Sequence, residues 1–163
     1  MIRIASLLFF IFFVCGCDHK MVYEQNKDIQ DGWRLDQIIN FNIDVKDTIS
    51  NMEMYINIRH TSDYPFTNIW LFINTLDPQG QYKKDTVECV LAEKSGKWKG
   101  SGLGRIKFLR TKLKNISFDS KGEYKFFIEQ AMRHGSRPKI QVLPEIINVG
   151  IRLQKTNHTD VKK

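Results

Sequence analysis

The chain has 163 residues, 42% of them hydrophobic, and a formal net charge of +7 at pH 7. This length accommodates one domain with a hydrophobic core of its own. Its 25 lysines and arginines are scattered rather than clustered, so the basic charge predicts no nucleic-acid partner and only an unspecific attraction to anionic membranes or cell-wall polymers.

The first residues predict a secretory signal of the lipoprotein type. Arg3 supplies a positive start, and residues 4–14 are almost wholly apolar, a stretch too short to cross a bilayer as a helix. Gly16 is the small residue that bacterial lipoprotein processing requires directly before a cysteine, here Cys17. We therefore expect cleavage between Gly16 and Cys17, which removes residues 1–16. The alternative is an ordinary secretory signal whose cysteines are incidental.

Cys17 then becomes the point at which the chain is attached to a membrane. We expect a thioether-linked diacylglycerol and an N-linked acyl chain such as palmitate on Cys17, and no other cofactor. Two or three acyl chains, at roughly 0.8 kcal/mol per buried CH₂, give stable anchoring without a transmembrane helix. Residues 17–32 are polar and predict a flexible tether. Residues 33–155 form the expected domain, and residues 156–163 a disordered tail.

Alternation of apolar and polar residues predicts most strands of the domain. The alternating runs are residues 41–45, 52–58, 123–132 and 147–153, and residues 82–92 are expected to form a strand as a hairpin partner. Residues 66–76 are apolar on both faces, which predicts a central strand buried on both sides. Asp77-Pro78-Gln79-Gly80 predicts a turn that joins this strand to the next in a hairpin. Residues 105–118 carry strand-like patches among many lysines and predict irregular strand and loop.

Strands at fairly regular spacing, with no amphipathic helical pattern, predict an all-β protein. We expect an antiparallel β-sandwich of about seven strands after the signal and the tether. The period of two alone does not separate a jelly-roll-like from an immunoglobulin-like topology, and both remain open.

Few residues of the chain predict chemistry. The histidines share no metal-ligand spacing with one another or with a cysteine; they are His19, His60, His134 and His158. Cys89 lies among apolar strand residues, which predicts a small buried side chain rather than a nucleophile. Four carboxylates were weighed as a calcium or carbohydrate site, but their positions favour turn capping and solvation; they are Asp47, Asp63, Asp85 and Glu88. We therefore predict no enzymatic activity, no metal and no small-molecule substrate.

Three aromatic residues are the candidates for contact with a partner protein, together with the sheet edges. They are Trp33, Tyr64 and Trp98. Trp33 follows Asp31-Gly32 at the junction of tether and domain, and tryptophan is a favoured residue at binding hot spots. The simpler interpretation of Trp33 is that it fastens the chain onto the sandwich.

Short segments spread over the whole chain point to a family through their order and spacing. They are Asp31-Gly32-Trp33, Asp47-Thr48-Ile49-Ser50, Asn57-Ile58-Arg59, Asp63-Tyr64-Pro65-Phe66-Thr67-Asn68, Asp85-Thr86, Trp98-Lys99-Gly100-Ser101-Gly102, Gly122-Glu123-Tyr124, Glu129-Gln130-Ala131-Met132-Arg133 and Val149-Gly150-Ile151-Arg152. Together with the cysteine after the signal, these segments resemble the GldH family of gliding-motility lipoproteins over nearly all of the chain that follows the signal.

The resemblance implies a non-catalytic accessory lipoprotein of the cell envelope. Its partners would be other envelope proteins of the gliding-motility machinery and the associated type IX secretion apparatus, and the family analogy favours the outer membrane. The residues after the anchor, Asp18-His19-Lys20-Met21, lack the acidic cluster typical of surface-exposed lipoproteins of this kind. We therefore expect a domain on the periplasmic face. The resemblance assigns no functional residue other than Cys17.

Two other functions remain open at this stage. The first is a carbohydrate-binding envelope lipoprotein, in which Trp70, Tyr82 and Trp98 would form a stacking platform, although Trp70 is expected to be buried. The second is an enzyme such as a cell-wall hydrolase, which would need a paired acid and base in a cleft. The sequence shows no such pair.

Overall fold

The computed structural model describes residues 20–156 except 134 and 136–138, and its regular elements are all strands. The strands are β1 (Met21–Asp28), β2 (Trp33–Arg34), β3 (Ile39–Val45), β4 (Met52–Thr61), β5 (Asn68–Leu76), β6 (Tyr82–Val90), β7 (Ile106–Ile116), β8 (Gly122–Gln130), β9 (Val142–Leu143) and β10 (Ile146–Lys155). Within these residues, no helix is long and apolar enough to cross a membrane. The predicted signal, its cleavage site at Gly16, the anchor at Cys17 and the tail from residue 157 lie outside the described residues.

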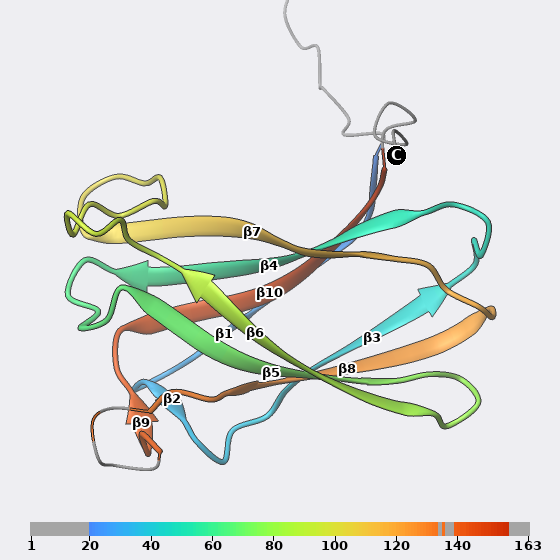
Figure 1. The fold of residues 1–163 in the computed structure, drawn as a ribbon, viewed down its shortest axis with the longest axis horizontal. Helices are drawn as coiled ribbons and strands as arrows, with labels where there is room; N and C mark the ends of the chain where they lie inside the picture. Colours follow the sequence, from blue (N-terminus) through green and yellow to red (C-terminus); the bar gives the residue numbers. More distant parts are fainter. Residues whose placement is uncertain (1–19, 134, 136–138, 157–163) are drawn as a thin grey trace, which may run out of the picture.

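Eight long strands form two four-stranded antiparallel sheets packed face to face, which confirms the all-β sandwich (Figure 1). Sheet I has the order β1-β10-β4-β7, and sheet II has the order β3-β8-β5-β6. Apart from the β5–β6 hairpin, successive long strands alternate between the two sheets. This pattern is that of a double-sheet jelly roll and differs from the immunoglobulin order, in which three consecutive pairs (A–B, D–E and F–G) are neighbours within a sheet. The short strands β2 and β9 add a two-stranded ribbon.

The core lies between the two sheets and is built from the inward residues of their strands. In β3, buried Phe41, Ile43 and Val45 alternate with exposed polar residues, as the period of two predicted. From the opposite sheet, β4 contributes Ile56 and Ile58, and β10 contributes Ile151. These three side chains are fully buried. Burial of such aliphatic side chains, at roughly 25 cal/mol per Å² of apolar surface, is the main force that holds the sheets together.

The tether prediction for residues 17–32 was wrong for half of that segment, residues 21–28. Residues 21–28 form β1, which pairs along its length with β10 from Met21 opposite Gln154 to Asp28 opposite Asn148. The folded domain therefore begins at least as early as residue 21 rather than at 33. The sequence pattern failed because β1 is an edge strand whose outer side chains are polar, and only Tyr23 packs against the core.

The prediction of irregular strand and loop for residues 105–118 was also wrong, because residues 106–116 form β7, the longest of the described strands. Its alternation is broken by a register shift opposite Met54 and Tyr55, where Lys114 and Lys112 are the successive partners. A bulge of this kind changes which face a side chain points to. Lys114 accordingly leaves the outer face of sheet I and forms an ion pair with Asp85 of β6, across the seam between the sheets.

The turn at Asp77-Pro78-Gln79-Gly80 joins β5 and β6 as predicted, and the backbone N–H of Gly80 donates to the carbonyl of Asp77 at 3.0 Å. The prediction that β5 is buried on both sides was only half right. Ile69, Leu71 and Ile73 point into the core and are buried. Trp70 lies on the opposite face of the strand, and its side chain is exposed.

Candidate functional site

Trp33, predicted as a possible contact residue, is buried and presents no surface to a partner in this structure. Its side chain has 0% exposed surface, and its indole N–H donates to the carbonyl of Gln37 at 3.0 Å. Trp33 lies in β2, where it pairs with Leu143 of β9 and caps one end of the core. The simpler interpretation, that Trp33 fastens the chain onto the sandwich, is the one that this burial supports.

Tyr64 is likewise buried, at 3% exposure, and its hydroxyl donates to the carbonyl of Asn68 at 3.0 Å. The prediction of Tyr64 as a contact residue was therefore wrong. Trp98 is half-buried, and its ring centroid lies 4.6 Å from that of His60 in an edge-on arrangement. Burial lowers the pKa of His60, whose Nδ1 lies 2.8 Å from the carbonyl of Thr61. Trp98 thus covers a buried, neutral histidine.

The aromatic surface that remains open is on the outer face of sheet II. Trp70 is 39% exposed, and together with Phe72 it lines a hollow of about 280 Å³. Thr86 of the neighbouring strand β6 and Ala131 and Arg133, which follow β8, complete the lining. We call this surface the Trp70 hollow. Its position follows from the alternation of β5, which sends even-numbered residues outward because odd-numbered residues fill the core.

Hydrogen bonds hold the Trp70 hollow in shape. The backbone of Trp70 accepts from the N–H of Ala131 at 2.8 Å, and its own N–H contacts the sulfur of Met132 at 3.2 Å. These bonds continue the β5–β8 pairing beyond the end of β8. The side chain of Trp70 is therefore carried on a paired backbone rather than on a loop.

Charged groups surround the rings of the hollow. The ammonium of Lys84 lies 3.9 Å from the centroid of the Phe72 ring, a cation–π contact. Glu88 stands opposite Trp70 and accepts from the amide of Asn68 at 2.5 Å. An apolar centre within a polar rim is the usual anatomy of a protein–protein contact. Because β6 is an edge strand of sheet II, the hollow also adjoins one of the sheet edges predicted as contact surfaces.

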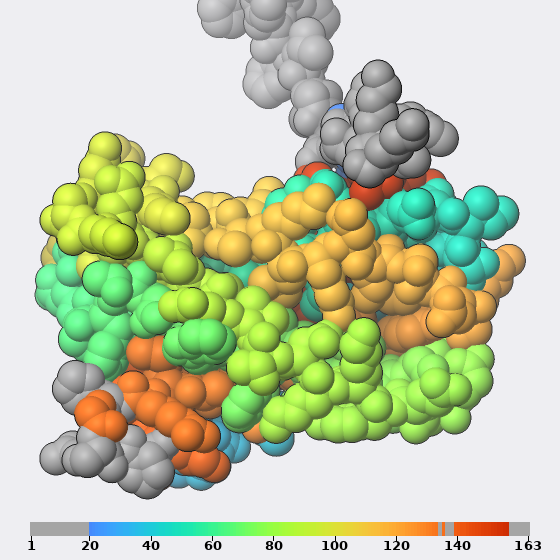
Figure 2. All heavy atoms as spheres, in the orientation of Figure 1, coloured from blue at the N-terminus to red at the C-terminus, as the bar shows by residue number. Residues whose placement is uncertain are grey.

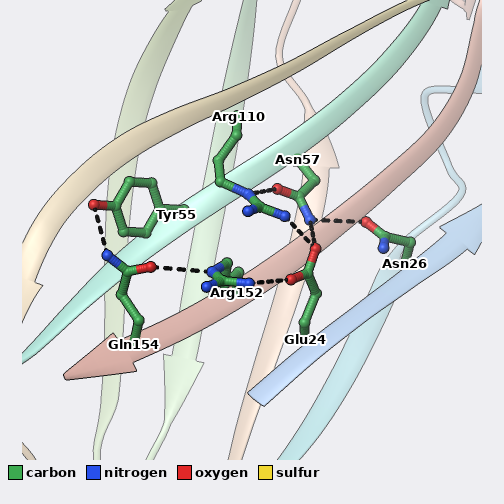
Figure 3. A network of polar contacts seen from close by, with 7 residues as sticks. All are labelled: Glu24, Asn26, Tyr55, Asn57, Arg110, Arg152 and Gln154. Carbon is green, nitrogen blue, oxygen red and sulfur yellow. Dashed lines mark hydrogen bonds and ion pairs between the residues drawn. The ribbon is translucent and has the colours of Figure 1, made fainter. Parts of the chain in front are cut away.

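The outer face of sheet I is different, because a network of polar side chains covers it (Figure 3). Glu24 of β1 accepts from Arg152 of β10 at 2.6 Å and from Asn57 of β4 at 2.8 Å, and it also pairs with Arg110 of β7. Asn57 is fully buried beneath these side chains, and its amide also donates to Asn26 at 3.0 Å. The network thus joins all four strands of sheet I.

The electrostatics of this network favour the ionised carboxylates. Partial burial alone would raise the pKa of Glu24, but hydrogen bonds from Arg152 and Asn57 and the charge of Arg110 hold it below its usual range. Nearby, hydrogen bonds from Lys112, Tyr55 and Gln154 lower the pKa of Glu53 to about 2. Because every charge found in this network has a partner, we assign it the structural role of tying β1 to the sheet.

Gly150 of β10 has a role in the same attachment. A Cβ atom on Gly150 would lie 2.0 Å from Oδ1 of Asn26 and 2.5 Å from the carbonyl oxygen of Gln25. Any larger residue would therefore push β1 away from β10. Close approach of an adjacent backbone is a known reason for glycine within a strand.

The four carboxylates weighed as a calcium or carbohydrate site do not come together. Asp47 pairs with Lys155, Asp63 with Arg105, Asp85 with Lys114, and Glu88 with Asn68. Among residues 20–133, 135 and 139–156, the structure has no group of three or more histidine, cysteine or acidic residues that could hold a metal ion. Cys89 is fully buried, and this burial, with the charge of Glu88, raises its thiol pKa to about 12. Its nucleophilic thiolate form is therefore disfavoured.

The carbohydrate platform considered from the sequence is not assembled either. Trp70 and Tyr82 both lie in sheet II, but Tyr82 is opposite Leu76, six residues along β5 from Trp70. At about 3.3 Å per residue this separation is about 20 Å. Trp98 stands beside His60, between the end of β6 and the start of β7. Trp70 was expected to be buried, but it is exposed and lines the Trp70 hollow.

Comparisons with known proteins agree with the predicted family. The family model described as GldH lipoprotein matches residues 21–153. The "Gliding motility lipoprotein GldH homolog" of Christiangramia forsetii is 36% identical over 158 residues, covering 94% of this chain and 97% of the relative. The "Gliding motility lipoprotein GldH" of Flavobacterium johnsoniae is 32% identical over 154 residues, covering 93% and 92%.

Among solved structures, a chain described as "A novel family GH115 4-O-Methyl-alpha-glucuronidase, BtGH115A, with specificity for decorated arabinogalactans" is similar to 82% of this chain, with a TM-score of 0.38 and 12% identity. The alignment spans only 14% of that glucuronidase. Similarity at this level assigns no activity. The family match, by contrast, spans the strands from β1 into β10, and the alignments with the two relatives cover 97% and 92% of their lengths. The chain therefore belongs to the GldH family of gliding-motility lipoproteins.

Proposed function

We propose that this protein is a non-catalytic accessory component of the gliding-motility and associated type IX secretion machinery. It is anchored by a diacylglycerol and an N-linked acyl chain on Cys17, after removal of residues 1–16, at the periplasmic face of the outer membrane. Its relatives carry the name gliding motility lipoprotein. The family name supports a lipid-anchored envelope protein that acts with other motility components.

The observation that carries the docking role is the Trp70 hollow. It joins an exposed tryptophan to a rigid sheet, it has a volume of about 280 Å³, and its rim is charged. Tryptophan and arginine are the residue types most enriched in binding hot spots, and the hollow offers both, as Trp70 and Arg133. Lipid anchoring would confine the domain to a thin layer at the membrane and so raise its local concentration near envelope proteins. A contact of modest area and weak affinity would then be sufficient for binding.

Affinity purification of the tagged, lipidated protein from its native membranes after crosslinking tests this proposal. The expected result is recovery of motility or secretion components by the wild-type protein and their loss with Cys17→Ser and with Trp70→Ala. Ile106→Ala is the matched control, because Ile106 is 47% exposed on β7 of the other sheet. Equal recovery by Trp70→Ala and wild type would remove the hollow from the proposal, and recovery of no envelope protein by the wild type would contradict the accessory role.

A carbohydrate-binding lipoprotein is the second candidate, and one observation favours it. The exposed ring of Trp70 beside Phe72, with Thr86 and Arg133 near it, is a geometry on which a sugar ring can stack. A glycan array distinguishes this candidate from the first. Selective binding that is lost in Trp70→Ala but kept in Ile106→Ala would establish it, whereas no binding by the folded wild-type protein would exclude the array's glycans as ligands.

A further inference from the structure

The structure places a fully exposed aliphatic side chain close to the point at which the chain leaves the anchor. Ile49 lies in the loop between β3 and β4 and is 95% exposed. Isolated exposed apolar residues are common on protein surfaces and need no explanation by themselves. Ile49 differs from other exposed apolar residues in that its loop is linked by hydrogen bonds to residues near both ends of the described chain.

Hydrogen bonds tie the loop to both ends of the described chain. The backbone N–H of Thr156 donates to the carbonyl of Asn51 at 3.0 Å, and the ammonium of Lys155 donates to Asp47 at 2.8 Å. The N–H of Lys155 in turn donates to the carbonyl of Lys20 at 2.9 Å. Lys20, residues 46–51, Lys155 and Thr156 therefore form one corner of the domain, which we call the anchor corner. In Figure 2 this part of the chain falls among the teal atoms at the upper right.

The chain length between this corner and Cys17 is short. Cys17 is three residues before Lys20, and an extended chain of three residues spans at most about 10 Å. Because β1 is paired with β10 from Met21 onward, the domain has no long tether of the kind that the polar composition of residues 17–32 predicted. A lipidated Cys17 would hold Lys20, the first residue of the anchor corner, within about 10 Å of the bilayer surface.

The loop presents Ile49 in a fixed conformation. One carboxylate oxygen of Asp47 accepts from the backbone N–H groups of Ile49 and Ser50, each at 3.0 Å, and the other accepts from the Ser50 hydroxyl at 2.7 Å. Lys155 and these hydrogen bonds hold the pKa of Asp47 well below its usual range. The carboxylate that shapes the loop is thus ionised at neutral pH, and the loop keeps Ile49 outward.

The charges around Ile49 suit a phospholipid headgroup layer. Lys20, Lys46 and Lys155 bring three ammonium groups to the anchor corner, where Lys46 pairs with Asp44 and Lys155 pairs with Asp47. The corner thus carries both signs of charge, as the headgroup layer does, with an excess of basic groups that an anionic membrane surface attracts. An exposed apolar side chain with basic residues beside it is a composition found at interfacial membrane contacts.

From these observations we propose that the anchor corner docks on the bilayer of its own lipid anchor, with Ile49 inserted between phospholipid headgroups. This proposal rests on the lipid anchor of the proposed function and adds an orientation to it. The domain stands with the starts of β1 and β4 at the membrane. The opposite end, where Thr61 of β4 pairs with Ile106 of β7, points away from it.

The test uses the lipidated full-length protein in vesicles of phosphatidylethanolamine and phosphatidylglycerol. An environment-sensitive NBD label is placed by Ile49→Cys and, as the matched control, by Leu103→Cys. Leu103 is 96% exposed and precedes β7 at the opposite end of sheet I, where the yellow-green loop projects at the upper left of Figure 2. A sample without an added cysteine measures any labelling of the buried Cys89.

The proposal predicts a blue-shifted, severalfold brighter emission at position 49 that nitroxide-labelled lipids quench, and an aqueous emission at position 103. Flotation with the vesicles but an aqueous emission at 49 overturns the docking and leaves the lipid anchor standing. A blue-shifted emission at 49 that nitroxide lipids do not quench shows a protein occupant and also overturns it. Failure of the wild-type protein to float contradicts the anchor itself, and the docking with it.

Discussion

Arg152 of β10 and Glu24 of β1 are joined by a hydrogen-bonded ion pair of 2.6 Å on the outer face of sheet I. The guanidinium is almost fully covered, with 7% of its side chain exposed, although none of the described strands packs against this face of sheet I. The pair connects the edge strand that follows the proposed anchor with a central strand of the sheet. If Cys17 is lipidated as proposed, any force between the anchor and the domain passes through β1, so the stability of this attachment would matter.

Arg152→Ala is predicted to destabilise the domain by about 3 kcal/mol, near the lower limit for removing one partner of a buried ion pair, because Glu24 keeps partial access to water. Chemical denaturation of the folded domain measures the change. Arg105→Ala is the matched control, because Arg105 pairs with Asp63 on the exposed surface, and it is expected to change stability little. Equal effects of the two substitutions would contradict the structural role of the network.

Gly150→Ala is predicted to loosen β1, since the added methyl group would overlap Asn26 and the carbonyl of Gln25. The expected cost is about 1–3 kcal/mol, the usual range for overpacking. Hydrogen exchange of the β1 amides is the direct readout. Combining the change with Asn26→Ala is expected to restore only part of the loss, because the overlap with the Gln25 backbone remains. Full restoration would show that the side chain alone sets the limit.

The stability of the protein is predicted to fall as the pH falls through the acidic range, in part through Glu53. Its folded pKa of about 2 lies below the model-peptide value of 4.5. The stabilisation is therefore complete above the unfolded pKa and is lost as protons bind between about pH 4.5 and 2. Glu53→Gln should weaken the protein at neutral pH but flatten this dependence. Urea denaturation at neutral pH and between about pH 4.5 and 2 measures the free energy of unfolding of both proteins. If that free energy falls with pH as steeply in Glu53→Gln as in the wild type, Glu53 is not a source of the pH dependence.

Truncation of two tryptophans is predicted to lower the stability of the protein to very different extents. Trp33→Ala removes a fully buried ring and should cost about 3–5 kcal/mol of stability. Trp70→Ala removes a ring that is 39% exposed on the open face, so its thermal unfolding temperature should fall far less. Thermal unfolding of the two variants side by side checks the prediction. A Trp70 variant as unstable as the Trp33 variant would mean that the Trp70 hollow is structural.

These two tryptophans also show how far the sequence alone leads. Alternation around Phe41 and Ile151 located the strands, because one face of each is apolar and the other is polar. Alternation could not predict which face of β5 is buried, because the residues on the Ile69 face and those on the Trp70 face are both apolar. The Ile69 face is buried because sheet I packs against that side of sheet II. Trp33 was ambiguous because its partner strand, β9, is only two residues long.

Hydrophobic periodicity could not predict the polar edge strand β1 or the bulged strand β7. In β1 the outward residues Glu24 and Asn26 are satisfied by side chains from β10, β4 and β7, so the strand exists through long-range partners that its own residues do not reveal. In β7 the register shift beside Tyr55 interrupts the alternation. The family resemblance, which depends on the order of segments rather than on periodicity, was confirmed.

The central claim is that an anchored GldH-family protein docks an envelope protein through the Trp70 hollow. Site-specific photocrosslinking in native membranes tests it most directly, with benzoylphenylalanine replacing Phe72 inside the hollow and Asn42 on the exposed outer face of β3 in the same sheet. The account predicts a protein adduct from position 72 that contains a motility or secretion component, is absent from position 42, and disappears with Cys17→Ser. No adduct from position 72, or equal adducts from both positions, would contradict it.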